Sequence, residues 1–295
     1  MTGRTARRRI VRIAASADPG GQGGPVTVLS RRPDLLAAEE PLEIRVNGRP
    51  LAVTMRTPGD DIDLAAGFLA GEGLVHAAGD ITEIRICREN HDGHRHDGSP
   101  PEGRGLGNVA EVTLASAAGL DEERLRRNFV TTSACGVCGK ASIDAIRVRA
   151  RYDVSADQVR VRADVLAGLP ATLREAQRIF ARTGGLHAAG AFTADGTLLA
   201  LREDVGRHNA VDKVAGWALR SGLLPLAGCV LLVSGRASFE LAQKAVMMGV
   251  PVLAAVSAPS SLAAELAEES GMTLVGFLRG SSMNVYTGAE RIVAS

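Results

Sequence analysis

The sequence predicts an α/β protein, with a mixed β-sheet flanked by helices and a smaller α+β domain on its N-terminal side. Three continuous apolar runs, at 228–235, 251–258 and 272–278, are typical of strands that are covered on both faces. Helical patterns at 238–249 and 260–271 alternate with these runs. Such alternation requires crossover connections and a mostly parallel sheet. The length of 295 residues is enough for one large domain or two moderate ones.

The first 27 residues are predicted to form a disordered tail that is basic and then rich in glycine. Arginines near a terminus occur in export signals, but such signals continue with an apolar run of about 7–15 residues. Here Ile10, Val11 and Ile13 are interrupted by Arg12, and the chain then turns polar. No stretch reaches the roughly 18 apolar residues that a membrane span needs. We therefore expect a cytoplasmic protein without a membrane partner.

Residues 28–120 are predicted to form the smaller α+β domain. Two strand-like runs are joined by Asn47-Gly48, a dipeptide that supplies the positive φ angles of a two-residue hairpin turn. A helix follows, with Asp60 or Asp61 as its cap. The remaining expected elements of this domain are strands at 81–89 and 109–115.

A polar segment at 90–108 separates those two strands and contains His91, His94 and His96. A metal site needs ligands held in a fixed geometry, and this segment offers neither a nearby cysteine nor a rigid element. We therefore interpret it as a solvated hairpin loop.

Residues 121–164 are predicted to form a linker region that carries a Cys-x-x-Cys pair. The region begins with a short helical pattern at 121–129. The stretch 141–149 fits a helix or a strand, and its periodicity does not decide between them.

The α/β domain is predicted to span 165–295. It opens with a helix over 169–184, which Gly184 stops, and continues with a hairpin that turns at Asp195-Gly196. An amphipathic helix then leads into the three apolar strands. The resulting order, α-β-β-α-β-α-β-α-β, matches the cytidine-deaminase-like core.

The Cys-x-x-Cys pair, Cys135 and Cys138, raises the question of zinc. A deaminase-type zinc site needs an H-x-E motif upstream and a proline before the pair, and the sequence has neither. A site with four cysteine ligands needs a second pair, but Cys87 and Cys229 stand alone in apolar strands. The sequence therefore predicts no structural metal.

Two other roles remain for the pair. Cysteines at this spacing lower the pKa of one thiol and close readily into a disulfide, but in thioredoxin-like dithiols they open a long helix. Here Gly136 and Gly139 loosen the backbone, as a thiolate that accepts and donates sulfur requires. Lys140 favours such a thiolate. The spacing alone leaves both roles open.

Composition argues against a nucleic-acid partner. Aromatic residues make up only 3% of the chain, which disfavours a platform of stacked rings. The formal net charge is +1, so the chain has no general excess of positive charge for holding a polyanion.

Five motifs carry a resemblance to a known family: "SACGVCGKASID", "TGGLHAAGAF", "REDVGRHNAVDKVAG", "VSGRASFELAQKA" and "GFLRGSSMNVYTG". From about Glu39 to Ile292 the chain resembles the formate dehydrogenase accessory sulfurtransferases, the FdhD/NarQ family. The resemblance implies that sulfur is taken as a persulfide from a cysteine desulfurase. It also implies that this sulfur passes to the molybdenum bis(molybdopterin guanine dinucleotide) cofactor, bound as a substrate, before the cofactor enters formate dehydrogenase.

The resemblance also implies roles for particular residues. Cys135 would bear the persulfide, with Cys138 as its neighbour in the catalytic pair, and Phe277–Ser282 would contact the cofactor. One departure is the stretch "YTGAERI", in which Gly288 stands where the family commonly has histidine. A role for that histidine is therefore not carried over.

Polar residues at three strand ends extend the predicted cofactor site, because helix N-termini beyond strand ends favour anionic ligands. Asp204 and Asn209 are candidates to read a guanine edge, and Arg207 is a candidate to contact phosphate. The full set of candidate cofactor-binding residues is Asp204, Arg207, His208, Asn209, Gly235, Arg236, Phe277, Leu278, Arg279, Gly280, Ser281 and Ser282. His187 is interpreted as a packed residue at the start of a strand.

Two alternative functions stay open in the sequence. One is a non-enzymatic carrier or chaperone that shields the guanylated cofactor and docks on formate dehydrogenase. The other is a dithiol oxidoreductase. The sequence does not distinguish molybdenum from tungsten and leaves the oligomeric state open, with a homodimer as one option.

Overall fold

The structure, a computed structural model, describes residues 3–15, 26–87, 107–116 and 150–294. Its strands are β1 (Thr5–Ala15), β2 (Val26–Ala37), β3 (Glu40–Val46), β4 (Arg49–Arg56), β5 (Ile81–Cys87), β6 (Val109–Leu114), β7 (Val161–Arg162), β8 (His187–Thr193), β9 (Leu198–Asp204), β10 (Cys229–Val233), β11 (Val252–Ala255), β12 (Thr273–Arg279), β13 (Ser282–Thr287) and β14 (Ile292–Val293). Its α-helices are α1 (Asp61–Gly71), α4 (Ala163–Ala176), α5 (Phe180–Thr183), α6 (Arg207–Arg220), α7 (Phe239–Met247) and α8 (Ser261–Glu269), and its 3-10 turns are η1 (Ala78–Asp80), η2 (Val154–Ala156) and η3 (Ala289–Arg291). Apart from the short α5, the elements from α4 to β12 follow the predicted order.

The larger sheet has the strand order β13-β12-β11-β10-β8-β9. Strands β10, β11 and β12 are parallel, whereas β8 and β13 pair antiparallel with their neighbours, which confirms the predicted mixed sheet. Because β9 runs in the same direction as β10, the C-terminal ends of β9, β10, β11 and β12 lie along one side of the sheet, which we call the carboxyl edge. Ligand sites in open α/β sheets form at such an edge. The likeness to the cytidine-deaminase-like core stays a prediction.

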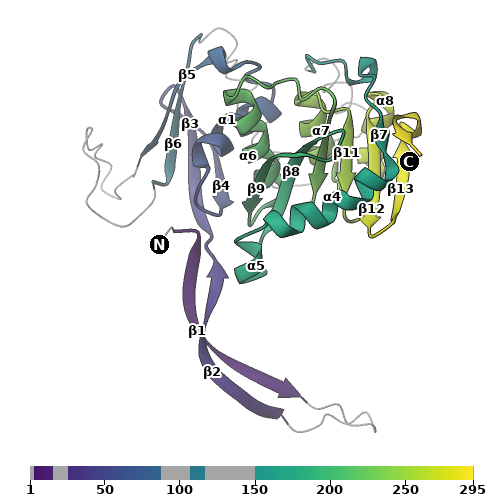
Figure 1. The fold of residues 1–295 in the computed structure, drawn as a ribbon. Coiled ribbons are helices and arrows are strands. Elements are labelled where there is room, and N and C mark those ends of the chain that lie inside the picture. The colour runs from purple at the N-terminus through teal and green to yellow at the C-terminus, as the bar shows by residue number, and fades with distance from the viewer. Residues whose placement is uncertain (1–2, 16–25, 88–106, 117–149, 295) are drawn as a thin grey trace.

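Helices cover both faces of this sheet (Figure 1). Helix α4 covers one face through Leu166, Leu169 and Leu173, which pack against strand residues that include Val230 and Val252. Helices α6, α7 and α8 cover the opposite face. Burial on both sides explains why the strand sequences are continuously apolar. No described helix has the length and the apolar character that a membrane span requires.

The smaller sheet has the order β4-β3-β6-β5, and α1 packs on it. Asn47 (φ 49°) and Gly48 (φ 79°) form the predicted turn between β3 and β4. Both further strands predicted for this domain are confirmed as β5 and β6. The predicted cap is wrong in its mechanism: Asp60 precedes α1, but its side chain makes no capping hydrogen bond. The Asp60 carboxylate instead forms an ion pair with Arg4 at 2.8 Å.

Helices α1 and α6 bring the two sheets together. Gly67 of α1 and Gly216 of α6 lie so close to the opposite helix that a Cβ atom on either would overlap backbone atoms there. Leu219 of α6 belongs to the hydrophobic core of the smaller sheet. The predicted domains 28–120 and 165–295 therefore share a buried interface.

Strands β1 and β2 form an antiparallel ribbon that extends away from both sheets (Figure 1). The prediction of a disordered tail over 1–27 is therefore wrong for residues 5–15, which form β1. Their β-branched members Ile10, Val11 and Ile13 favour a strand. The strand was missed because its partner, β2, lies beyond the tail and because an exposed ribbon needs no apolar run.

The helix predicted over 169–184 is divided in the structure into α4 and α5. The division is stabilised by Glu203, whose carboxylate accepts hydrogen bonds from Ile179 N at 3.0 Å and Phe180 N at 2.7 Å. The predicted stop is confirmed, since Gly184 follows α5 with a φ of 68°. Strand β13, which was not anticipated, pairs with β12 and forms the outer edge of the larger sheet.

Candidate functional site

The carboxyl edge brings together the three segments that the sequence predicts to bind a cofactor. The first follows β9 and opens α6, the second follows β10 and opens α7, and the third closes β12 and opens β13. Backbone hydrogen bonds connect neighbouring loops. Ser257 N donates to Gly235 O at 3.2 Å, and Phe277 N donates to Ser257 O at 3.1 Å. Ser257, which sequence reasoning missed, therefore links the second segment to the third.

Asp204 and Asn209 are buried, and their contacts are with the chain itself. The Asp204 carboxylate forms an ion pair with Lys213 Nζ at 2.7 Å and accepts a hydrogen bond from Thr57 N at 3.0 Å. Asn209 Nδ2 donates to Asp204 at 3.0 Å and to the Met55 carbonyl oxygen at 2.7 Å. These contacts attach α6 to the smaller sheet. The guanine-reading role given to Asp204 and Asn209 stays a prediction that none of these contacts supports.

Arg207 and His208 lie in the first turn of α6, next to the start of α7. His208 Nε2 is 3.4 Å from Ser238 Oγ and 3.8 Å from a carboxylate oxygen of Glu240. This contact with the imidazole, together with the Ser238 hydroxyl, lowers the pKa of Glu240 to about 2. The Nε atom of Arg207 is buried and has no hydrogen-bond partner among the described residues. A guanidinium with an unused donor is suited to an anion.

His187 opens β8 at the same edge. Its ring lies beside Gly235, and a Cβ atom added to that glycine would be 3.4 Å from His187 Nδ1. Burial lowers the pKa of His187, and the positive charges of Arg207 and His208 lower it further. The sequence analysis left His187 out of the site. The register of the β8–β9 hairpin places His187 opposite Asp204, and this register is the feature that could have identified His187 as a site residue.

The segment from Phe277 to Ser282 presents two large side chains at the surface, those of Phe277 and Arg279. Phe277 has a φ of 51° and a side chain that is 39% exposed. A positive φ is costly for a bulky residue and persists only where the surrounding structure holds it. Arg279 is exposed, and its Nε donates to the Val256 carbonyl oxygen at 2.9 Å, which anchors the guanidinium by one nitrogen. Leu278, by contrast, is fully buried in the core, so its side chain does not reach the surface.

The remaining predicted residues of the site lie in two loops. Gly280, with a φ of 54°, and the exposed Ser281 form the turn between β12 and β13. Ser282 Oγ donates to Arg279 O at 3.3 Å. Arg236 is exposed in the loop between β10 and α7. The edge thus carries three arginines that come from three different segments of the chain: Arg207, Arg236 and Arg279.

Cys135 and Cys138 lie outside the described residues, as do His91, His94 and His96. Within the described ranges, no group of three or more histidine, cysteine, aspartate or glutamate side chains is arranged to hold a metal ion. Cys87 is exposed at the end of β5. Cys229 is buried, which raises the pKa of its thiol.

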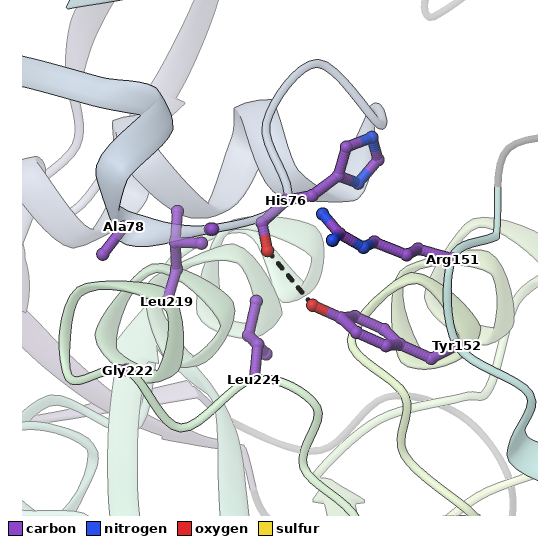
Figure 2. A pocket seen from close by; sticks show the side chains of 8 residues that line it. His76, Ala78, Arg151, Tyr152, Leu219, Gly222 and Leu224 are labelled. Carbon is purple, nitrogen blue, oxygen red and sulfur yellow. Dashed lines mark hydrogen bonds between the residues drawn. The ribbon is translucent and has the colours of Figure 1, made fainter. Parts of the chain in front are cut away.

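The described residues on either side of 117–149 meet at the turn around η1. Ala115 N donates to Asp80 O at 2.9 Å, and the Tyr152 hydroxyl donates to His76 O at 3.1 Å (Figure 2). Next to this turn lies a pocket of about 310 Å³. It is lined by His76, Ala77, Ala78, Arg151, Tyr152, Leu219, Gly222 and Leu224. Because Gly222 and Leu224 follow the C-terminal end of α6, this pocket lies at the other end of α6 from Arg207.

Comparisons with known proteins agree on one family. The model of the family described as FdhD/NarQ matches residues 37–293. The chain is 57% identical over 289 residues to a Streptomyces avermitilis protein named "Sulfur carrier protein FdhD", which covers 98% of this chain and 95% of the relative. It is also 57% identical over 261 residues to a Mycobacterium tuberculosis protein of the same name, covering 88% and 92%.

A solved structure has the same fold. The crystal structure of a formate dehydrogenase accessory protein from Desulfotalea psychrophila superposes with a TM-score of 0.67 at 24% sequence identity. The match covers 97% of this chain and 99% of that one. At this identity, the likeness shows the fold.

Proposed function

Because the chain belongs to the FdhD/NarQ family, we propose that it is a sulfur carrier that receives sulfur as a persulfide on Cys135 and delivers it to a guanylated molybdenum cofactor. Relatives that are named sulfur carrier proteins support the sulfur-transfer part. The cofactor, molybdenum bis(molybdopterin guanine dinucleotide), is the substrate, and its place is the carboxyl edge. The sulfur donor is a cysteine desulfurase, and the sulfurated cofactor is destined for formate dehydrogenase.

The main observation in favour of a cofactor site is that an exposed aromatic ring and an exposed arginine lie together at the end of β12. Phe277 keeps its ring at the surface despite a φ of 51°. A purine base stacks on such a ring. Arg279, two residues on, offers a planar guanidinium to the attached phosphates.

The neighbouring loops supply the rest of a diphosphate site. Arg207 opens α6, and Arg236 lies just before α7, so both arginines stand at helix N-termini, where the helix dipole favours an anion. Gly235 has no side chain, so the backbone of its loop is accessible to a ligand. The donors present therefore fit a nucleotide diphosphate.

Sulfur delivery requires the cysteine pair to serve both a donor and the bound cofactor. Helix α6 has 14 residues and is about 21 Å long, which sets the separation between the turn around η1 and the carboxyl edge. The stretch 117–149 contains 33 residues (149 − 116), and an extended chain covers about 3.3 Å per residue. The stretch is therefore long enough to reach across this separation.

Titration calorimetry with GDP tests the site. We expect wild-type protein to bind GDP and Arg279→Ala to bind about tenfold or more weakly, because a charge-assisted hydrogen bond contributes about 1.5–3 kcal/mol. Phe277→Ala removes the stacking surface and should also weaken binding. Arg85→Ala is the matched control, because Arg85 is an exposed arginine on β5 in the smaller sheet.

Each result bears on a distinct part of the proposal. Equal affinities for wild type and Arg279→Ala would remove Arg279 from the site. No binding of GDP to wild-type protein would remove the site from the carboxyl edge.

A further inference from the structure

The ribbon of β1 and β2 exposes apolar side chains along its length. Large apolar residues at the surface of a folded chain mark an interaction site when they gather in one place. The ribbon carries five such residues, each between 43% and 55% exposed: Val11, Ile13, Val28, Leu29 and Leu36. The proposed sulfur transfer makes no use of them.

The ribbon is also strongly basic. Its arginines, all exposed, are Arg7, Arg8, Arg9, Arg12, Arg31 and Arg32. Asp34, which pairs with Arg8 across the ribbon, is its sole acidic residue over 5–14 and 27–37. The whole chain has a net charge of +1, so this excess of positive charge is a local property of the ribbon.

Apolar side chains of one strand lie opposite arginines of the other at several positions of the ribbon. Val11 faces Arg31 on one side of the ribbon, and Ile10 faces Arg32 on the other. We propose that the ribbon is a docking surface for an extended acidic segment of a partner protein, in which carboxylates alternate with apolar side chains. The carboxylates pair with the arginines, and the segment adds as a third strand to an edge of the ribbon that pairs with no other described strand.

Other occupants fit these features less well. A second copy of this chain would place its own arginines against these, and like charges on facing strands are destabilising. A single-stranded nucleic acid favours aromatic side chains for stacking, and neither strand contains one. A lipid surface offers no hydrogen-bond partners to the backbone groups at a strand edge. It also could not cover all the exposed apolar side chains, because they extend back to Leu36, close to the two sheets.

The base of the ribbon lies beside the carboxyl edge. The Ala37 side chain is close to Gly185, two residues before His187. The next residue, Ala38, accepts a hydrogen bond from Thr57 Oγ1 at 2.9 Å, and Thr57 N donates to Asp204. A partner docked on the ribbon is therefore held next to the carboxyl edge. If the proposed function holds, such a partner can supply sulfur or receive the cofactor there.

Fluorescence anisotropy of a labelled peptide, in which glutamate alternates with valine, tests the docking surface on the full-length protein. We expect saturable binding that weakens as salt is raised. The triple variant Arg7→Gln, Arg9→Gln and Arg31→Gln should bind about tenfold more weakly. The double variant Val11→Thr and Val28→Thr, which keeps the strand propensity, should bind about threefold more weakly.

A matched control removes the same charge elsewhere on the surface. It combines Arg85→Gln, Arg160→Gln and Arg162→Gln, three exposed arginines outside the ribbon, and should keep wild-type affinity for the peptide. GDP titration of every variant reports on the carboxyl edge separately. Loss of peptide binding with GDP binding intact assigns the effect to the ribbon, whereas peptide binding without GDP binding would count against the nucleotide site alone.

Four results would overturn the docking proposal. The first is an absence of saturable binding by the acidic peptide, and the second is an equal affinity for the ribbon triple variant and its control. The third is tighter, arginine-dependent binding of a single-stranded oligonucleotide or of phosphatidylglycerol vesicles. The fourth is a wild-type dimer, seen by sedimentation, that the triple variant splits into monomers.

Discussion

Charged side chains at the carboxyl edge fall into two groups, one buried and paired within the protein and the other exposed to solvent. Asp204 and Lys213 form a buried ion pair at 2.7 Å, and removing one partner of such a pair costs about 3–5 kcal/mol. Arg236 and Arg279 are exposed. Substitutions of the exposed pair therefore report on ligand binding, whereas substitutions of the buried pair report first on folding.

The first cysteine of the pair is the one on which sulfur transfer should depend. Cys135 is the first thiol of the pair, and the family resemblance gives it the persulfide. We expect Cys135→Ala to abolish persulfide formation after incubation with a cysteine desulfurase and to leave formate dehydrogenase inactive in cells. Mass spectrometry of the peptide that contains the pair detects the adduct of one sulfur atom.

Cys138→Ala is the natural control for that measurement. If Cys138→Ala lost the adduct while Cys135→Ala kept full activity, the assignment of the two thiols would be reversed. A protein that delivers cofactor but never carries the adduct would instead be a non-enzymatic carrier.

The protonation of His187 should make stability depend on pH. Burial lowers the pKa of His187 in the folded chain below its ordinary value of 6.5. Below about pH 6.5 the unfolded chain therefore binds a proton that the folded chain does not, and stability falls as the pH decreases. His187→Gln removes this contribution, so its free energy of unfolding should fall less than that of wild type between about pH 7.5 and 5.5. Urea denaturation at several pH values measures both, and identical pH slopes would contradict the prediction.

At the residue scale, the sequence predicted that the three loops meet at one edge of the sheet but not which of their side chains face outward. Leu278 and Arg279 are adjacent in the motif, yet one is buried in the core and the other is exposed. Asp204 looks like a ligand in the sequence because its partners, Lys213 and Thr57, come from a helix and from the other domain. Such contacts depend on packing between elements, which a local motif does not encode.

The two sheets are joined where α1 crosses α6, and the backbones of these two helices approach closely there. Small residues allow two helix backbones to approach, and here each helix contributes a glycine at the crossing point. A Cβ on Gly67 would overlap the carbonyl oxygen of Asp212. Backbone atoms cannot move away as a flexible side chain can, so the overlap has to separate the helices.

We therefore expect Gly67→Ala to destabilise the protein by about 2 kcal/mol or more, even though alanine is the better helix former. Gly168→Ala is the matched control. Gly168 lies inside α4 and has no atom within 4 Å of its added Cβ, so this change should stabilise the protein by about 0.5–1 kcal/mol. Thermal unfolding of both variants decides the matter, and a Gly67→Ala protein as stable as wild type would show that the helices can separate without cost.

At the element scale, the sequence predicted the buried strands of the larger sheet and the hairpin at Asn47-Gly48. Both depend on local signals, an apolar run and a turn dipeptide. The ribbon was missed because β1 is stabilised by pairing with β2, outside the predicted tail. The break between α4 and α5 was missed because Glu203, which stabilises it, lies on β9.

The whole molecule is held together by contacts between the two sheets, although the sequence suggests separate domains. The buried Lys213 donates to the Thr57 carbonyl oxygen at 2.9 Å, and Arg202 pairs with Asp63 at 2.8 Å. Without α6, the apolar residues that α1 shares with Leu219 would lose part of their cover. The smaller sheet therefore depends on the larger one for a closed core.

This dependence predicts a single cooperative unfolding transition. Trp217 is the sole tryptophan of the chain and lies in α6, so its fluorescence reports on the junction, whereas far-ultraviolet circular dichroism reports on both sheets. In urea, we expect both signals to change with the same midpoint and slope. In Gly67→Ala, both midpoints should move to lower urea by the same amount, because the overlap weakens the element that the two sheets share. Two separate transitions would instead show that each sheet folds with its own core and that the crossing of α1 and α6 only joins them.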